Sequence, residues 1–487
     1  MLLQEIPWLV LLVVLPLAGA MLCFLLPLRV RLLGLATALA IVASVMALTQ
    51  QVMQQGAIRY AVGGWDAPLG INLYVDGLSL LMLLLTALLG LAISIYSSAY
   101  FKTDKAGYFW PLWLLLWAAL NALFLSADIF NLYVTLELMG LAAVALVALA
   151  GGASALAAAM RYLLVSLLGS LFYLLGVALL YHSFATVDIL LLSQQMASAP
   201  TVGVAVSLAM GLMIAGLLLK TALFPLHFWL PAAHASAPAP VSALLSALVV
   251  KASFYILLRL WLEVFPLSAL SMAQVLAQLL GLLGAAAVLW GGFQALRQTR
   301  LKLLIAYSTV VQIGYLFLAF PLASIIGWQA ALYMLLAHAV AKTAMFLAAG
   351  NILYYGGHDR IVDLDQVAQR LPLTLAAFAL AGISLIGLPP SGGFIAKWLL
   401  LEAAIRAGQW WWGIVLIVGG LLTAAYVFKV VGCAFTRSEL PHDSCVVPAR
   451  MEWSALVLAL LAIALGFLAP MPLALMSIGS PFAEGVP

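Results

Sequence analysis

The chain has 487 residues, of which 67% are hydrophobic and 7% are charged. A soluble core does not need that much apolar surface, so the composition excludes a soluble globular protein and indicates a polytopic membrane protein. The formal net charge of +4 comes without a basic cluster, which gives no case for nucleic-acid binding. The three cysteines have neither metal-ligand spacing nor the even count of a disulfide framework, so we expect no metal site.

Apolar runs long enough to cross a bilayer occur at about fourteen places. The first lacks the basic region of a signal peptide and is long enough to span, so we interpret it as a transmembrane helix. The sequence therefore predicts an all-α polytopic membrane protein with about fourteen transmembrane helices. Aromatic residues around 108–117 and 410–412 are expected to form interfacial belts. The expected spans are 6–26, 30–52, 77–98, 109–126, 128–149, 160–182, 204–236, 240–262, 273–293, 302–321, 327–348, 372–405, 412–435 and 453–477.

Lysine and arginine are distributed unevenly among the connecting loops. The loops after odd-numbered spans hold most of them, for example Arg29, Lys102 and Lys302, whereas the loops after even-numbered spans hold Arg59 and Arg406. Cytoplasmic loops of membrane proteins carry the excess of Lys and Arg. We therefore expect a multi-pass protein of the cell (inner) membrane with both termini on the outer, periplasmic side.

Two of the expected spans are interrupted by helix breakers close to a lysine. In the seventh span Lys220 precedes Pro225 and Pro231, and in the twelfth a Pro-Pro-Ser-Gly-Gly stretch precedes Lys397. Proline inside a membrane helix frees backbone carbonyls, which are tolerated where protein or water satisfies them. Such breaks at corresponding places of two halves are typical of ion sites in repeated transporter units.

The two breaks lie five spans apart, and an odd offset reverses the direction in which the chain crosses the membrane. We therefore predict two inverted five-helix repeats, spans 4–8 and 9–13, each with one broken helix. The expected organisation is a group of three helices at 1–105, a first repeat at 106–265, a second repeat at 266–436 and a C-terminal fourteenth helix at 437–487.

Ionisable side chains lie inside several spans, where a charge is costly and usually marks an ion path or a charge partner. Lys220, His227 and His234 follow one another at intervals of seven residues, which places them on roughly one stripe of an unbroken helix. His338 and Lys342 are four residues apart and share a face of the eleventh span. A row of titratable groups along one passage is the hypothesis that this spacing favours.

Glu137 is the acid that lies in the middle of a span, and Lys220 is its natural partner. Burial disfavours the charged form of a lysine, whereas a nearby carboxylate favours it. An amine held near the balance of these two effects binds and releases a proton at neutral pH. The polar residues Ser308 and Gln312 form a polar face on the tenth span.

Structural roles are the alternative for each of these groups. A single intramembrane lysine can snorkel or make a structural hydrogen bond, and Arg259, near a helix end, is expected to snorkel to the interface. His227 is equally well explained as a structural histidine, and His234 as a partner of carbonyls freed at the break. Asp76 and Glu263 are expected to be solvated or capping carboxylates.

Several separate stretches resemble one family. The antiporter-like subunits of respiratory complex I and of Mrp-type cation/proton antiporters have a signature similar to LKTALFPLHFWLPAAHASAPAPVSALLSALVVKAS. Their tenth, eleventh and broken twelfth helices are similar to RQTRLKLLIAYSTVVQIGYL, AHAVAKTAMFLAAGNILY and LPPSGGFIAKWLLL. The resemblance covers about residues 75–435. Within this family, the chain is most similar to the D-type members of Mrp antiporters. The similarity lies in the overall length, in the presence of Glu137 and Lys220, and in the stretch GGWDAPLGINLYVDGLSLLMLLLTALLGLAI.

The resemblance implies fourteen helices with inverted repeats around a hydrophilic axis at mid-membrane. In that axis Glu137 and Lys220 are the switching ion pair, Lys251 bridges the two halves and Lys397 is the terminal group. His227 and His234 are candidate relays beside it. The proton-transfer axis that we expect consists of Glu137, Lys220, Lys251, His338, Lys342 and Lys397.

We therefore expect a proton-translocating subunit of a multisubunit sodium/proton antiporter, which is an ion transporter and not an enzyme. Sodium is the expected cation, with potassium and lithium as alternatives. The expected partners are other hydrophobic subunits and the lipid bilayer. No redox cofactor is expected, because no motif for flavin, haem or iron–sulfur ligation is present.

Two alternatives stay open at this point. Related subunits occur in NADH–quinone oxidoreductases and membrane-bound hydrogenases, so the chain also fits a proton-pumping subunit of a redox complex. Co-purification with iron–sulfur or quinone-reducing partners would favour that alternative. The other is a structural scaffold whose axis is inactive, in which alanine at Glu137 or Lys220 would leave transport intact.

Overall fold

The computed structural model describes residues 7–198, 203–265, 273–364, 366–436 and 445–479. Most of these residues are helical. The α-helices are α1 (Trp8–Leu25), α2 (Val30–Gln55), α3 (Gly77–Tyr100), α4 (Thr103–Leu125), α5 (Ile129–Ala148), α6 (Gly152–Phe184), α7 (Ile189–Ser198), α8 (Val204–Thr221), α9 (Leu230–Ser236), α10 (Ala239–Leu244), α11 (Val250–Arg259), α12 (Ala273–Arg297), α13 (Leu301–Phe317), α14 (Ala319–Leu322), α15 (Ile325–Gly356), α16 (Val367–Arg370), α17 (Pro372–Ile386), α18 (Gly392–Arg406), α19 (Trp411–Cys433), α20 (Ala449–Ala464) and α21 (Pro470–Leu475). Two strands, β1 (Ile58–Ala61) and β2 (Asn72–Val75), and the short helices η2 (Pro27–Arg29), η3 (Val62–Gly64) and η7 (Ile361–Asp363) complete it, with π-helical segments η4 (Leu245–Val249) and η5 (Leu260–Val264).

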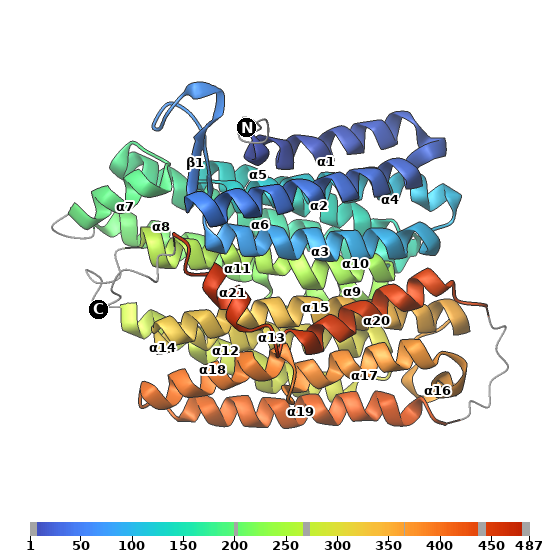
Figure 1. Ribbon diagram of the computed structural model, residues 1–487. Helices are drawn as coiled ribbons and strands as arrows, with labels where there is room; N and C mark the ends of the chain where they lie inside the picture. The colour runs from blue at the N-terminus through green and yellow to red at the C-terminus, as the bar shows by residue number, and fades with distance from the viewer. Residues whose placement is uncertain (1–6, 199–202, 266–272, 365, 437–444, 480–487) are drawn as a thin grey trace.

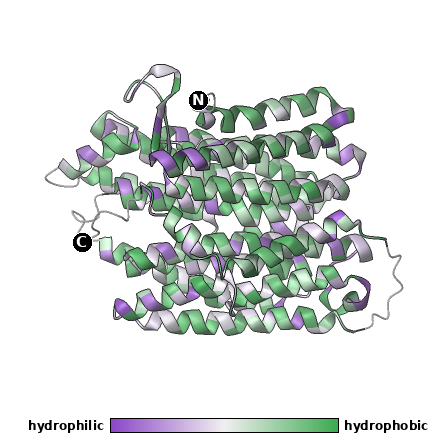
Figure 2. Ribbon diagram, viewed as in Figure 1, coloured by the Kyte–Doolittle hydropathy of each residue, from purple (hydrophilic) through white to green (hydrophobic). Residues whose placement is uncertain are grey.

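The helices form one bundle in which most long axes run side by side (Figure 1). The N-terminal half of the chain occupies the upper part of that view, and α12 to α20 occupy the lower part. Hydrophobic residues cover most helices along their whole length (Figure 2), which suits helices that contact lipid on one side and other helices on the other. This confirms the predicted all-α polytopic membrane fold.

In the described part of the chain, twelve helices are long and apolar enough to cross a membrane. Two further expected spans correspond to shorter helices, namely the pair α17 and α18 and the 16-residue α20. A broken span is expected to appear as two short helices. The count of fourteen, the inverted repeats and the division after residues 105, 265 and 436 stay predictions, and residues 437–444 and 480–487 of the last segment lie outside the described ranges.

Both predicted helix breaks are present. The residue after α8, Ala222, has a left-handed backbone with φ +58°, and the residue after α17, Gly387, has φ +86°. A left-handed residue ends a helix because the next peptide cannot continue the hydrogen-bond ladder. Lys220 precedes its break, whereas Lys397 follows its break, so the two lysines occupy opposite sides of the two interruptions.

The eighth expected span contains two π-helical segments that the sequence did not predict. Lys251 lies just after η4, and Arg259 lies just before η5. A π-helical turn inserts one extra residue and changes which backbone groups are paired, and such turns often occur at functional sites.

Arg259 does not snorkel, because it is neutralised inside the protein. Its side chain is 4% exposed, and its guanidinium donates to both carboxylate oxygens of Asp76, with Nη1–Oδ2 at 2.7 Å and Nη2–Oδ1 at 2.5 Å. Glu263, one turn further on, accepts another bond from Nη1. The expectation of a solvated or capping carboxylate is confirmed for Asp76 as a cap, since the Ser79 amide donates to it. The Arg259 cation offsets the desolvation of this buried carboxylate.

The expected aromatic belt around 108–117 was wrong for its tryptophans, whereas Tyr108 is 69% exposed. Trp110, Trp113 and Trp117 are fully buried between helices. The ring of Trp110 lies over Gly34, where an added Cβ would come within 2.0 Å of it. Small residues let helices approach closely in membranes, and here the glycine accommodates a large ring. Trp410, in the other expected belt, is exposed.

A hairpin of β1 and β2 projects from one end of the bundle (Figure 1). The strands pair antiparallel, with Arg59 opposite Tyr74, and Arg59 forms an ion pair with Asp188 before α7. The C-terminal segment lies at the same end, because the Gly77 amide at the start of α3 donates to the Ile478 carbonyl at 2.7 Å.

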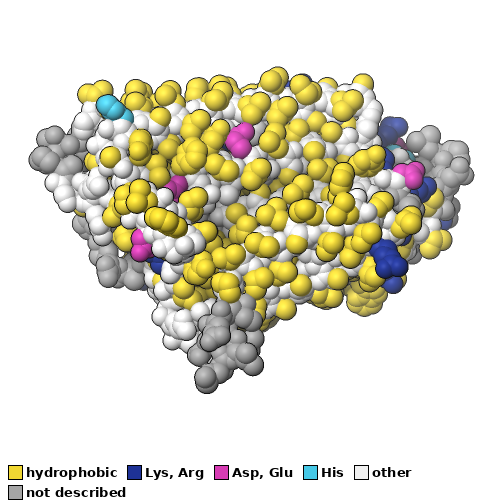
Figure 3. Space-filling model, turned by 90° about the horizontal axis from the view of Figure 1, so that it is seen from above, with side chains coloured by type: hydrophobic (Ala, Val, Ile, Leu, Met, Phe, Trp, Pro, Cys, Tyr) yellow, Lys and Arg dark blue, Asp and Glu magenta, His cyan; other side chains and the backbone are white. Residues whose placement is uncertain are grey.

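Basic side chains are unevenly distributed over the surface. The face in Figure 3 is largely hydrophobic, and most of the lysine and arginine side chains visible there lie toward its right-hand end. This agrees with a multi-pass membrane protein whose basic loops gather on one side. The outer placement of the termini stays a prediction, and residues 1–6 and 480–487 lie outside the described ranges.

Candidate functional site

An ion pair joins α5 and α8 in the first half of the chain. The Glu137 Oε1 and Lys220 Nζ atoms are 3.1 Å apart, and the two side chains are 18% and 4% exposed. Lys220 also donates to the Ser166 hydroxyl at 2.9 Å, and the Ser170 hydroxyl donates to Glu137. The contact predicted from the sequence is therefore present, and its role in transport stays a prediction.

Glycines allow the helices α5, α6 and α8, which surround the Glu137–Lys220 pair, to pack closely against one another. An added Cβ on Gly140 of α5 would lie 2.8 Å from the Ser166 hydroxyl oxygen. On Gly216 of α8 it would lie 2.3 Å from the carbonyl oxygen of Gly169 in α6. Close backbone contact of this kind is how small residues position membrane helices. The distance between the charged groups thus depends on residues that carry no charge.

Lys251 on α11 is fully buried and has a different kind of partner. Its amine donates to the backbone carbonyl of Ser246, which lies within the π-helical segment η4. The Ser246 hydroxyl is 2.9 Å from the Thr309 hydroxyl of α13. This chain of polar groups leads from the eighth expected span to the tenth.

His338 and Lys342 lie one turn apart on α15 and are both buried. Lys342 donates to the Ile305 carbonyl at 2.7 Å and to the Ser308 hydroxyl, both on α13. Neither ring nitrogen of His338 has a hydrogen-bond partner among the described residues. The polar face predicted at Ser308 therefore meets one of the predicted lysines.

Lys397 on α18 lies against the carboxyl end of α17. Its amine donates to the carbonyls of Ile386 at 2.8 Å and Leu385 at 3.2 Å, and it lies 4.7 Å from the centre of the Tyr315 ring. The carboxyl end of a helix carries partial negative charge, and an aromatic face attracts a cation. The helix end and the aromatic ring are both favourable partners for a lysine ammonium, although neither is a carboxylate.

The helix α13 contacts three of these lysine sites. Thr309 bonds to Ser246, Ser308 accepts from Lys342, and Tyr315 lies under Lys397. Within the described ranges, Glu137 and Lys220 are the one pair of predicted site residues joined directly by a hydrogen bond. The other groups are connected through side chains and carbonyls of their neighbours.

The two histidines near the first break have different surroundings. His227 lies in the turn between α8 and α9 and stacks on Phe224 with ring centres 5.5 Å apart. His234 on α9 is fully buried and stacks on Phe346 at 4.9 Å. Its two ring nitrogens have no hydrogen-bond partner in the part of the chain that is described. The alternative in which the His234 ring bonds freed carbonyls was therefore wrong.

Those carbonyls are bound by Lys302, a residue that the sequence placed in a loop. Lys302 is 2% exposed, and its amine donates to the carbonyls of Ala235 and Ala237 at the end of α9. Ser166 and Ser170 were also missed, although their spacing of four residues on an apolar helix was an available signal. The position of Lys302 at the start of an apolar run gave no such signal.

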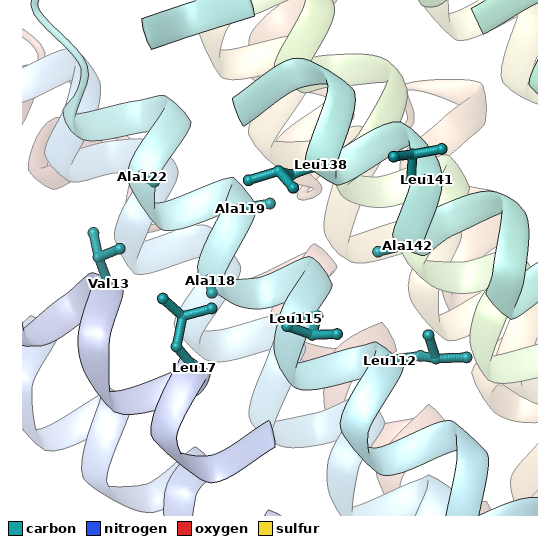
Figure 4. Close-up of a pocket in the computed structure, with 10 residues that line it drawn as sticks. All are labelled: Val13, Leu17, Leu112, Leu115, Ala118, Ala119, Ala122, Leu138, Leu141 and Ala142. Atoms are coloured by element: carbon teal, nitrogen blue, oxygen red, sulfur yellow. The ribbon is translucent and has the colours of Figure 1, made fainter. Parts of the chain in front are cut away.

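A groove in the surface is separate from these groups. It lies between α1, α4 and α5, has a volume of about 310 Å³ and is lined by valine, leucine and alanine side chains (Figure 4). Because no polar side chain lines it, it offers nothing to bind or conduct an ion. Among the residues that the structure describes, no three His, Cys, Asp or Glu side chains are grouped as a metal site.

The chain matches two models of protein families. Residues 126–423 match the family described as NADH:quinone oxidoreductase/Mrp antiporter, transmembrane. Residues 62–109 match the N-terminus of chain 5 of NADH-ubiquinone oxidoreductase, complex I. The first match includes all the residues of the predicted axis.

Individual relatives come from both kinds of complex. The N-type membrane component of NADH-quinone oxidoreductase from Desulforudis audaxviator is 39% identical, with 83% of this chain and 80% of that protein aligned. The D-type component of the Na(+)/H(+) antiporter from Bacillus subtilis is 28% identical, with 88% and 87% aligned. Among solved structures, a chain of the Mrp complex from a Dietzia species is 28% identical and superposes with a TM-score of 0.88, covering 97% of each chain.

Proposed function

We propose, because the chain belongs to the NADH:quinone oxidoreductase/Mrp antiporter family of membrane subunits, that it translocates protons within a multisubunit sodium/proton antiporter. The observation that carries this proposal is the Glu137–Lys220 ion pair between apolar helices, at 3.1 Å. A membrane subunit with a structural role alone has no need of a buried pair set beside a broken helix.

In the proposed mechanism the Glu137–Lys220 pair acts as a switch. While the pair is closed, the carboxylate stabilises the ammonium of Lys220, with Ser166 and Ser170 completing the hydrogen bonds. When the pair opens, the ammonium loses its counter-charge in an apolar surrounding and releases its proton. Movement of one carboxylate thus controls whether Lys220 holds a proton.

Protons then pass along the remaining groups of the axis. Lys342 donates to the Ser308 hydroxyl of α13, and Lys251 donates to the carbonyl of Ser246, whose hydroxyl contacts Thr309 of the same helix. Lys397 follows at the carboxyl end of α17. His227 and His234 are the proposed relays beside Lys220. Each group binds a proton when its neighbour is neutral, because like charges in a low dielectric repel strongly.

Sodium is the proposed cation, with potassium and lithium as alternatives, and the proposed partners are other hydrophobic membrane subunits. This rests on the Na(+)/H(+) antiporter component and the Mrp complex among the relatives. The proposed location is the inner membrane, with both termini outside. The axis moves protons without chemical conversion of a substrate, so the proposed subunit is a transporter and not itself an enzyme.

A second candidate function is proton pumping in a redox-driven complex. The 39% identity to a membrane component of NADH-quinone oxidoreductase favours it. The axis would be the same, but electron transfer in partner subunits would supply the energy. Purification of the native complex distinguishes the two, because iron–sulfur or quinone-reducing subunits in it would contradict the stand-alone antiporter. The scaffold alternative predicts transport that does not depend on the axis.

The test is sodium-driven proton movement in inverted vesicles that contain the whole complex. We expect Glu137→Gln and Lys220→Ala to lower exchange at least about tenfold, because each change removes one of the two charges that control protonation in the proposed switch. The matched control is Glu402→Gln, since Glu402 forms an exposed ion pair with Arg406 at 2.6 Å. Assembly is followed by a tag on a partner subunit. Unchanged exchange in an assembled Glu137→Gln complex would leave this chain a scaffold.

A further inference from the structure

The apolar groove of Figure 4 lies along the outside of α4, between α1 and α5. Its floor consists of small side chains, since Ala118 and Ala119 of α4 and Ala142 of α5 are all less than 8% exposed. Its rim on α5 consists of Leu138 and Leu141, which are 53% and 51% exposed. Alanines between exposed leucines leave a narrow apolar depression on a surface that meets the hydrocarbon of the bilayer.

The length of the groove suits a lipid chain better than the helix of another subunit. On α4 the groove extends from Leu112 to Ala122, which is about 15 Å at the rise of an α-helix. A helix that crosses the bilayer passes through about 30 Å of hydrocarbon, so it would meet this groove over only half of its length. An acyl chain occupies one leaflet, which is half of that thickness.

The stripe of α4 that lines the groove continues to a lysine at one end of the helix. Lys105, Tyr108, Leu112, Leu115 and Ala119 follow one another at intervals of three or four residues, which places them on one face. Lys105 and Tyr108 are exposed, and tyrosine is typical of the membrane–water interface. Ala119 lies about 21 Å along the helix from Lys105, which matches the thickness of one leaflet with its headgroups, about 20 Å.

This end of the groove is positively charged. The Lys105 amine donates to the carbonyl of Ala150, just after α5, at 2.9 Å. An ammonium has three N–H donors, so others are available to a phosphate. Arg31 adds a second cation, because its guanidinium donates to the Phe101 carbonyl before α4 at 2.7 Å. Asp104 in the first turn of α4 offsets only one of these charges, so an anionic headgroup is favoured here.

We infer that the groove binds one acyl chain of an anionic phospholipid whose phosphate is bound by Lys105. The lipid belongs to the leaflet that the basic loops place on the inner side. At the other end of α5 the capping carboxylate of Asp128 disfavours an anionic headgroup. The bound chain packs against Leu138 and Leu141, which flank Glu137 along α5. The inference does not depend on the proposed function, because it concerns lipid binding and its test does not measure exchange.

The test uses two photoreactive lipids in vesicles that contain the whole complex. One is phosphatidylglycerol and the other is phosphatidylcholine, each with a diazirine in the distal half of an acyl chain. After illumination, mass spectrometry locates the adducts on peptides of α4 and α5. We expect adducts at groove residues such as Leu115 and Leu138, at least about fivefold more with phosphatidylglycerol because of its negative charge.

Two results of this comparison would overturn the inference. Equal adducts from the two lipids would show ordinary contact with bulk lipid. No adducts from either lipid would show that another subunit of the complex covers the groove.

Variants test the headgroup site and the chain site separately, with assembly followed by a tag on a partner subunit. Lys105→Gln keeps a donor for the Ala150 carbonyl but removes the charge, so adducts from phosphatidylglycerol should fall at least about fivefold. Ala119→Phe should lower them as much, because the ring occupies the floor of the groove. Unchanged adducts in either assembled variant would overturn the inference.

The matched controls lie away from the groove. Arg370→Gln removes an exposed cation at the end of α16, and Leu171→Trp adds a ring at a position of α6 that is 59% exposed. Both should give the same adducts in the groove as the wild type. A fall as large as that in Lys105→Gln would show an effect of overall charge or of lipid-facing bulk, and would overturn the site.

Discussion

The lysines of the expected axis have three kinds of oxygen as partners. Lys220 has a carboxylate and a hydroxyl, and Lys342 has a hydroxyl and a carbonyl. The oxygen partners of Lys251 and Lys397 are backbone carbonyls. A carbonyl stabilises an ammonium by hydrogen bonding but does not neutralise it. Breaking the Glu137–Lys220 contact would therefore remove a negative charge from beside the ammonium, whereas breaking one hydrogen bond at another lysine would remove only a neutral partner. This asymmetry is the reason for placing the switch at that pair.

The buried Arg259–Asp76 pair is expected to be a major source of stability. We expect Arg259→Gln to destabilise the protein by about 3–5 kcal/mol, because it leaves the Asp76 carboxylate buried without its cation. Thermal unfolding of the purified complex measures the change as a lower Tm. The control is Arg360→Gln, whose pair with Asp363 has an arginine side chain that is 60% exposed and should contribute about 0–1 kcal/mol. Equal Tm values for the two variants would contradict a structural role for the buried pair.

At the scale of helices, two structural features position the charged groups, namely helix breaks and close glycine contacts. Helix breaks after α8 and α17 free backbone groups beside Lys220 and Lys397. Glycine contacts then set the spacing of the helices, as between α6 and α8 at Gly169 and Gly216. Since Gly216 lies one turn before Lys220, the packing of one glycine positions the amine.

Replacing Gly216 should therefore impair transport through geometry alone. An alanine there would bring its Cβ within 2.3 Å of the Gly169 carbonyl oxygen, so α8 must shift, at a cost of about 1–3 kcal/mol for overpacking. We expect Gly216→Ala to lower both sodium-driven exchange and Tm. Gly211→Ala is the control in the same helix, because nothing lies within 4 Å of an added Cβ at that position. Similar exchange in the two variants would argue against this positioning role.

At the scale of the whole molecule, α13 connects the two halves of the axis. Its residues reach the α9 carbonyls, the η4 turn, Lys342 and Lys397. Packed helices transmit small shifts because they have few alternative arrangements. A change at the first break therefore has a direct physical route, through one helix, to the lysine at the second break.

The orientation of the molecule can be tested with a native residue. Cys445 is exposed, and its amide donates to the Tyr355 carbonyl near the end of α15. The uneven basic loops predict that this connection faces the inner side. We expect a membrane-impermeant thiol reagent to label Cys445 in inverted vesicles and not in right-side-out vesicles. Cys445→Ser identifies the labelled site, and labelling restricted to right-side-out vesicles would reverse the predicted topology.

The sequence by itself determined the fold class, the two helix breaks and the Glu137–Lys220 contact. Long apolar runs, prolines and glycines act on the chain locally. Glu137 is the one acid in the middle of an expected span, so it was the available partner for a lysine inside the membrane. The tertiary structure decided where other charges are neutralised. Arg259 meets Asp76 from a distant helix, and Lys302 is buried because other helices surround the start of its own. Burial and counter-charge are properties of packing between segments far apart in the chain, so no local pattern could have shown them.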